Sequence, residues 1–184
     1  MQLKFIGLTK NKKDAIYSLI IILFCVISIF QKHKNYFLKK ELKDCEEYYY
    51  SQVYGMIERL MDDNKDYAKH DVKLVVIFSP EDCEVCIKEI SSLWSFVKEN
   101  TNIGFYGLIN HPYPDLVKRF MKTKNWLFPY KIINNNLYGN GFGFEVTPVK
   151  ILIRNERVVY IEGALSDWEK EGRVKDYIRT IVDN

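Results

Sequence analysis

The sequence has few of the residues that define several common classes of protein. Its 184 residues include four cysteines and three histidines, too few for a disulfide scaffold or a His-rich metal site. Basic residues number 27 against 24 acidic ones, so the net charge of +3 gives no support for nucleic-acid binding. Hydrophobic residues make up 47%, which excludes a disordered chain. The length fits one ordinary domain with about thirty to forty residues left over.

The charges are unevenly distributed along the chain. Residues 1–44 hold nine lysines and three acidic residues, whereas residues 45–184 hold 18 basic and 21 acidic residues. An uncharged run of 17 residues, 15–31, interrupts the basic part. As a helix it is about 25 Å long, which crosses a bilayer if flanking lysines snorkel. We therefore predict a basic tail over 1–14 and a transmembrane anchor in contact with lipid over 15–31.

A cleaved signal peptide and a buried core helix are the alternatives to an anchor. The small residues of a cleavage site are missing, because Phe30, Gln31 and Lys32 end the run. Lysines on the two sides nearly balance, so charge does not orient the segment. A short basic tail, one span and then the whole domain is the usual layout of a signal anchor. We therefore expect the domain on the extracytoplasmic (periplasmic) side of the cell membrane.

Residues 32–71 are predicted to form an amphipathic connecting helix followed by a linker. Apolar residues recur every three or four positions, at Leu38, Leu42, Cys45, Tyr49, Val53, Met56 and Leu60. We expect the second half of the helix to pack on the domain. The alternative is a coiled-coil homodimer, with an intermolecular disulfide at Cys45. Cys25 is most simply a lipid-facing side chain.

Residues 72–184 alternate between strand-like and helix-like segments. The continuous apolar run at 74–78 is typical of a strand that is buried on both faces. The predicted elements are this strand, a helix at 83–98, a strand at 103–109, a helix at 115–124, an irregular segment to 144, strands at 149–154 and 157–161, and a helix at 167–182. This order predicts an α/β fold.

Cys83 and Cys86 form a Cys-x-x-Cys motif directly after the first strand. At a helix start, unpaired N–H groups and the helix dipole favour a thiolate at Cys83, so Cys83 is the candidate nucleophile and Cys86 the resolving residue. Ser79 or Asp82 is the candidate helix cap. A structural disulfide and a zinc half-site are the alternatives, and the half-site lacks further ligands nearby.

These landmarks resemble the thioredoxin fold family. A buried strand, the Cys83-x-x-Cys86 motif, a Thr147-Pro148 pair before a hairpin, and a last helix occur in the family's order over residues 72–182. The resemblance implies a thioredoxin-like α/β fold, with a central mixed β-sheet flanked by helices. It also implies a cis bond before Pro148, which leaves the Thr147 backbone free to bind substrate.

The long separation of Cys86 and Pro148 indicates an insertion at about 110–145. Together with the anchor, it makes the chain similar to the membrane-tethered TlpA-like branch, whose members act outside the cytoplasm as thiol-disulfide oxidoreductases. This similarity implies protein thiol or disulfide substrates and an upstream electron donor. It implies no organic cofactor, because the redox group is the Cys83–Cys86 disulfide.

Several residues near the cysteines depart from the family pattern. Asp82 replaces the tryptophan that commonly precedes the first cysteine, and Ile77 replaces a buried acid. Glu81, Asp82 and Glu84 surround Cys83 with negative charge, which should raise the pKa of its thiol. A less stable thiolate favours the disulfide, so we expect a reductant.

Other readings of the motif remain. A redox-inactive thioredoxin-like binding module keeps the Cys83–Cys86 disulfide for structure alone. A peroxiredoxin-type peroxidase is disfavoured, because no Ser or Thr stands three residues before either cysteine.

We expect His111 to be a capped loop histidine rather than a ligand. Five aromatic residues are expected in the core, or alternatively in a substrate groove near Pro148: Trp126, Phe128, Tyr130, Phe142 and Phe144.

Overall fold

The computed structural model describes residues 3–61, 67–99, 102–133, 147–163 and 173–182, with side chains from residue 23 onward apart from Ala68 and Val182. The chain divides into two compact units, Met1–Tyr48 and Tyr49–Asn184, which are described separately. The elements are α1 (Leu3–Met61), a short 3-10 helix (Tyr67–Lys69), β1 (Val72–Phe78), α2 (Glu84–Lys98), β2 (Ile103–Asn110), α3 (Pro114–Thr123), β3 (Tyr130–Ile133), β4 (Val149–Arg154), β5 (Arg157–Glu162) and α4 (Arg173–Val182).

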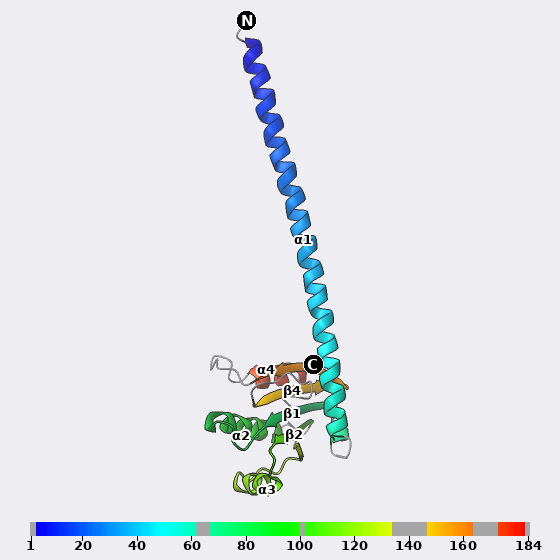
Figure 1. Ribbon diagram of the computed structural model, residues 1–184, viewed down its shortest axis with the longest axis vertical. Helices are drawn as coiled ribbons and strands as arrows, with labels where there is room; N and C mark the ends of the chain where they lie inside the picture. The colour runs from blue at the N-terminus through cyan, green and yellow to red at the C-terminus, as the bar shows by residue number, and fades with distance from the viewer. Residues whose placement is uncertain (1–2, 62–66, 100–101, 134–146, 164–172, 183–184) are drawn as a thin grey trace. The chain divides into compact units, whose positions relative to one another are not determined.

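The first unit consists of the N-terminal part of α1 (Figure 1). Residues 1–79 contain no proline, so nothing in the sequence interrupts the helical hydrogen bonds. The predicted anchor, 15–31, falls within α1, and its first eight side chains lie outside the described part. Among the residues whose side chains are described, no helix is long and apolar enough to span a membrane.

The second unit contains a five-stranded sheet in the order β3-β2-β1-β4-β5. β1 pairs in parallel with β2, and β2 in parallel with β3. β4 runs antiparallel to both β1 and β5. The predicted central mixed sheet is therefore present, and β1 lies in its middle.

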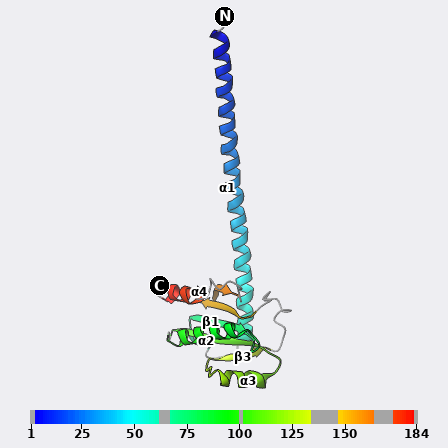
Figure 2. The ribbon, with the colours of Figure 1, turned by 90° about the vertical axis from the view of Figure 1, so that its left-hand side faces the viewer.

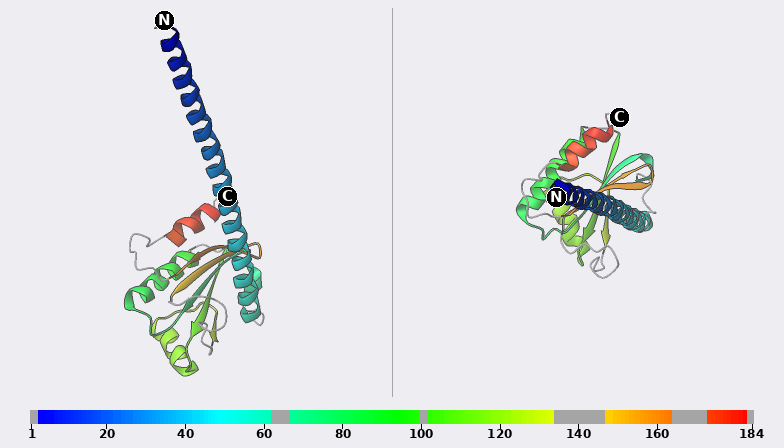
Figure 3. Two further views of the ribbon diagram at one scale, coloured as in Figure 1. Left: turned by 45° about the horizontal axis from the view of Figure 1, so that its top comes forward. Right: turned by 90° about the horizontal axis from the view of Figure 1, so that it is seen from above.

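Helices cover both faces of the sheet within this unit (Figure 3). Leu74, Val76 and Phe78 of β1 pack in one cluster with α2 and α4, whereas Val75 and Ile77 pack on the opposite face with the last turns of α1. This alternation is the period-two pattern of a strand buried on both sides. Figure 2 shows α3 beside the β3 edge of the sheet.

The apolar residues predicted to face the core from α2 are buried there. Ile87, Ile90, Leu93 and Val97 are buried at a helical spacing. Trp94, also expected there, is half-buried, and its ring lies 5.5 Å from the ring of Phe105 and 5.4 Å from that of Phe128.

The β4–β5 hairpin also confirms the prediction. Its turn residues, Asn155 and Glu156, both have positive φ angles, of 49° and 61°. Positive φ at both central residues is the geometry of the two-residue turns that match the twist of a hairpin.

The second half of α1 packs on the sheet, as predicted. Val53 is buried there, and Met56 and Leu60 are partly buried against the same cluster. The most deeply buried residues also include Ile57 and Met61, which the predicted set did not contain.

The segment after α3, expected to be irregular, contains β3. Four residues are too few for a periodic signal, and the pairing of Ile132 with Ile109 of β2 is a tertiary contact. The predicted closing helix begins at Arg173, with residues 167–172 outside the described part.

We predict that Ile57→Ala lowers the free energy of unfolding by about 2–5 kcal/mol, because Ile57 is fully buried against the sheet and truncation leaves a cavity. The matched control is Leu42→Ala on the same helix, where the side chain is 70% exposed and a change within about 0.5 kcal/mol is expected. Urea unfolding of the full chain measures both. Equal effects at the two positions would contradict the assignment of the last turns of α1 to the domain core.

Candidate functional site

The cysteine pair lies where the chain passes from β1 into α2. β1 ends at Phe78, a turn follows, and Cys83 is the N-cap of α2. A disulfide joins Cys83 to Cys86; Cys83 is exposed and Cys86 is half-buried. Solvent therefore reaches the first cysteine more readily than the second, and the first lies at the positive end of the helix dipole.

The predicted caps, Ser79 and Asp82, do not cap α2. The Cys83 sulfur occupies that role and accepts a hydrogen bond from the Cys86 N–H at 3.2 Å. Asp82 is occupied elsewhere, because its Oδ2 accepts from the Ser79 N–H at 2.9 Å. The Asp82 N–H in turn donates to the Ser79 carbonyl at 3.1 Å. These two bonds close the turn that precedes the cysteines.

Thr147 and Pro148 lie beside this turn. The Thr147 hydroxyl donates to Asp82 Oδ1 at 2.5 Å, although the two residues are 65 positions apart in the sequence. The peptide bond between Thr147 and Pro148 is cis, as the family resemblance implies. Thr147 is half-buried and Pro148 is buried. The structure thus places the predicted substrate-binding pair next to the residue that precedes Cys83.

The three predicted pKa-tuning carboxylates each have a different partner. Asp82 is partly buried, and burial raises its pKa, with the hydrogen bonds from Thr147 and Ser79 acting in the opposite direction. Glu84 is exposed and pairs with Lys88 at 2.8 Å. The hydrogen bond and charge of Lys88 lower the pKa of Glu84. The negative charge near Cys83 is therefore partly offset at Glu84.

The third carboxylate, Glu81, lies near His111. Its Oε1 is 3.5 Å from His111 Nε2, and the histidine is buried. His111 Nδ1 accepts a hydrogen bond from the Tyr113 N–H at 3.1 Å, as expected of a capped loop histidine. Nδ1 also lies 3.3 Å from the Tyr113 carbonyl oxygen, so both contacts hold the ring against the start of the loop. His111 thereby ties the end of β2 to the turn before the cysteines.

A group of charged residues next to the site was not predicted. Lys150, two residues after Pro148, is buried and forms ion pairs with Glu89 and Glu162. The signal available in the sequence was a lysine inside an otherwise apolar strand. Such a lysine is expected on an exposed strand face, and only the packing of α2 over β4 buries it.

Two of the five predicted aromatic residues pack in the core. Trp126 and Phe128 are buried, and their rings lie 5.7 and 6.5 Å from the ring of Phe78. Tyr130 is half-buried on β3. Phe142 and Phe144 lie outside the described residues.

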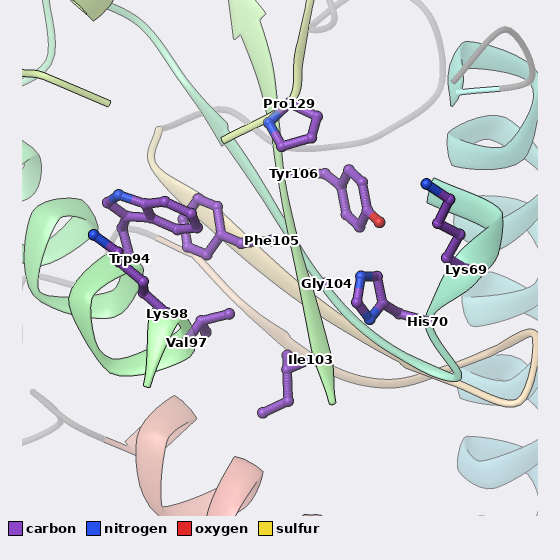
Figure 4. A pocket seen from close by; sticks show the side chains of 10 residues that line it. All are labelled: Lys69, His70, Trp94, Val97, Lys98, Ile103, Gly104, Phe105, Tyr106 and Pro129. Atoms are coloured by element: carbon purple, nitrogen blue, oxygen red, sulfur yellow. The ribbon is translucent and has the colours of Figure 1, made fainter. Parts of the chain in front are cut away.

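A groove of about 380 Å³ lies away from the cysteines (Figure 4). Its lining includes Ile103, Gly104 and Phe105 at the start of β2, whereas the cysteines follow the carboxyl end of the parallel neighbour β1. Trp94 and Phe105 line it on one side of β2, and His70 and Tyr106 on the other. It therefore follows the edge of a strand and takes no part in the cysteine site.

Two further features concern metals and the other cysteines. In the part of the chain that the structure describes, no three His, Cys, Asp or Glu side chains are grouped to hold a metal ion. Cys25 and Cys45 are both exposed and not in a disulfide. An intermolecular disulfide at Cys45 stays the alternative to an unpaired cysteine, and a single chain does not test it.

We predict that the Asp82–Thr147 hydrogen bond couples the two halves of the site. In a double-mutant cycle with Asp82→Ala and Thr147→Val, the interaction energy in urea unfolding of the oxidised full chain should be about 1–2 kcal/mol, because the acceptor is a partly buried carboxylate. The control pairs Asp82→Ala with Thr123→Val, whose hydroxyl bonds to the Arg119 carbonyl on exposed α3. The changes in unfolding free energy of that control pair should be additive. Additive changes for the Asp82 and Thr147 variants would refute the coupling.

Comparison with known proteins gives structural matches alone. No protein-family model matches the sequence, and no curated protein matches it. Among solved structures, the chain is similar to a protein from Neisseria meningitidis assigned as a thioredoxin, with TM-score 0.52 and 21% identity over 66% of this chain and 80% of the other.

Two more solved structures are similar to the chain. A thioredoxin-like protein from Porphyromonas gingivalis has TM-score 0.52 and 13% identity, over 61% of this chain and 76% of the other. The C-terminal domain of a protein from Bacteroides thetaiotaomicron assigned as a thiol-disulfide oxidoreductase has TM-score 0.51 and 17% identity, over 65% and 82%. The chain therefore has the thioredoxin-like fold that its Cys83-x-x-Cys86 and Thr147-Pro148 motifs indicate.

Proposed function

We propose that the protein is a thiol-disulfide oxidoreductase that exchanges the Cys83–Cys86 dithiol and disulfide with protein substrates. One observation carries the proposal: an exposed Cys83 and a half-buried Cys86 are joined in a disulfide at the start of α2, beside Thr147 and the cis Pro148. A purely structural disulfide has no need of an exposed first sulfur at a helix N-terminus.

The exchange takes place in two displacement steps. In the reduced protein the Cys83 thiolate attacks a substrate disulfide, forming a mixed disulfide and releasing one substrate thiolate, which takes up a proton. Cys86 then gives its proton to solvent and attacks the Cys83 sulfur, releasing the second substrate thiolate. The substrate gains two electrons and two protons, and the protein is left with the Cys83–Cys86 disulfide. The electrons are carried by the sulfur atoms, so the reaction needs no organic cofactor.

We propose that Thr147 and Pro148 present the substrate. The Thr147 backbone lies beside the turn that carries Cys83, where an extended substrate segment can pair with it. The Asp82 carboxylate holds the Thr147 hydroxyl, which fixes this backbone relative to the cysteines.

We further propose that the protein acts as a reductant. Partly buried Asp82 and exposed Glu81 add negative charge near Cys83, which disfavours its thiolate and so favours the disulfide. An upstream donor must then return two electrons to the pair after each turnover.

We also propose that the protein is anchored in the cell membrane. The uncharged run 15–31, flanked by lysines and contained in α1, supports an anchor in the cell membrane with the domain on the extracytoplasmic side. We also propose a homodimer through residues 32–61 of α1.

Fractionation of cells that express the full chain tests the anchor. Recovery in the membrane pellet after an alkaline wash is expected, and recovery in the soluble fraction would contradict the anchor.

We predict that the full chain, with Cys25 and Cys45 replaced by serine, shows one reversible transition in glutathione buffers. Its midpoint should lie closer to about −270 mV than to about −120 mV, the values of a reducing and a strongly oxidising member of this fold. Alkylation of the reduced thiols measures the midpoint. A midpoint of about −120 mV would contradict the proposal that the protein acts as a reductant.

Trapping of mixed disulfides distinguishes catalytic cysteines from a purely structural disulfide. Cys86→Ser should accumulate mixed disulfides with reducible protein substrates such as insulin, because the resolving thiol is missing. Cys83→Ser should accumulate none. A pair that never reduces, together with no trapped species, would favour the redox-inactive binding module.

A further inference from the structure

The first half of β2 is an open edge of the sheet. β1 runs beside β2 from Ile103 to Ile109. β3 pairs with β2 only from Gly107 onward, because Tyr130, its first residue, lies opposite Gly107. In the part of the chain that the structure describes, no strand therefore lies beside residues 103–106 on the β3 side. An unpaired edge of this kind can accept an additional strand.

The hydrogen bonds of Gly107 show which backbone groups this edge offers. The Gly107 N–H donates to the Pro129 carbonyl at 2.9 Å, so the backbone polar groups of Gly107 point toward β3. Alternate residues of a strand direct these groups toward opposite neighbours. Phe105 and Ile103 therefore point an N–H and a C=O each toward the open side. An added strand would find two donors and two acceptors there.

The groove of about 380 Å³ follows the same edge (Figure 4). Trp94 of α2 lines it on one side of β2, and His70 and Tyr106 line it on the other. Gly104 between them has no side chain, and a Cβ there would lie 2.5 Å from the Tyr106 ring and 2.9 Å from the His70 ring. The two rings therefore pack directly on the strand and form one wall of the groove.

The charged residues of the groove are all basic. Of its ten lining residues, Lys69 and Lys98 are exposed, His70 is half-buried, and none is acidic. Figure 4 shows Lys98 and Lys69 on opposite sides of β2. The side chains of an added strand would alternate between these two sides. Acidic side chains on such a strand complement the charge on both sides.

We propose that this groove, named here the edge groove, binds an extended acidic segment of a partner protein, which joins the sheet beside residues 103–106. Hydrogen bonds to the open backbone groups hold the segment, and Lys98 and Lys69 select its carboxylates. Consecutive side chains of the segment face opposite sides. Two acidic residues at an odd spacing therefore reach both lysines, whereas two at an even spacing reach only one.

The edge groove is distant from the cysteine site. Ile103 lies opposite Val72 at the start of β1, whereas Cys83 comes after Phe78, which lies opposite Ile109. Six residues of strand separate the two pairs, a distance of about 20 Å. A segment in the edge groove thus leaves Cys83 open to a substrate. The inference goes beyond the proposed function, because docking at this edge needs no thiol exchange.

Binding of short peptides to the detergent-solubilised full chain tests the proposal. The probes are labelled eight-residue peptides of threonine and valine with blocked ends, and fluorescence anisotropy measures their dissociation constants. A peptide with two adjacent glutamates should bind most tightly, and more weakly as salt is added. Separating the glutamates by one residue should weaken binding about fivefold, and replacing both by glutamine about tenfold or more. If no peptide binds, or if the three bind equally, the proposal is overturned.

A charge reversal in the edge groove identifies where the peptide binds. Lys98→Glu should weaken binding of the peptide with adjacent glutamates about tenfold. The matched control is Lys88→Glu on the same helix, where the side chain is 73% exposed and lies about 15 Å away along the axis. It should leave the dissociation constant unchanged. Equal losses in the two variants would mean attraction by net charge alone and would overturn the edge groove as the site.

Backbone methylation of the peptide distinguishes strand pairing from attraction between charges. In a paired strand only alternate N–H groups face β2, so N-methylation should abolish binding at every second position in the centre of the peptide. Amide exchange of Phe105, measured by NMR, should also slow when the peptide binds. Binding that tolerates methylation at every position, or exchange that does not change, would contradict pairing with β2.

Amide exchange without peptide tests for other occupants of the edge. The Phe105 N–H should exchange faster than the Tyr106 N–H, which faces β1. Protection of Phe105 that falls on dilution would mean that a second copy covers the edge, and protection at every concentration would mean that another segment of this chain does. Either result overturns the proposal. A Cys83→Ser/Cys86→Ser variant should bind the peptide normally, so failure of the glutathione titration and failure of docking are distinguishable.

Discussion

The antiparallel pairing of β1 with β4 is the interaction on which the cysteine site depends. β1 ends at the turn that leads to Cys83, and β4 begins directly after Pro148, with Ile77 opposite Val149 in the ladder. This register places Thr147 next to Asp82 across a sequence separation of 65 positions. A slip of one residue would move every β4 side chain to the other face of the sheet, so the register of β4 fixes the geometry of the site.

The same register decides where charge lies around the cysteines. It directs Lys150 toward α2, where Glu89 pairs with it, and Glu162 of the neighbouring β5 is its second partner. The exposed carboxylates Glu81 and Glu84 remain in solvent. Charges in solvent interact weakly, because water and salt screen them, whereas buried charges act over longer distances.

Local signals in the sequence predicted most of the second unit. The uninterrupted apolar run of β1, the helical spacing of α2 and the Asn155-Glu156 turn each carry their own pattern within a few residues, and all three were found correctly. The errors fell where the deciding contact comes from elsewhere. β3 forms because β2 offers it a partner, and Asp82 fails to cap α2 because Ser79 and Thr147 already bind its carboxylate.

The sequence by itself determined the kind of chemistry available to the protein. A Cys-x-x-Cys motif after a buried strand, and a Thr-Pro pair before a hairpin, are local features whose meaning does not depend on the rest of the chain. Only the tertiary structure decided which groups surround the sulfur atoms. Thr147, which bonds to Asp82, and the two carboxylates that pair with Lys150 belong to other segments of the chain, and a side chain's burial and hydrogen bonds are fixed only when those segments pack together.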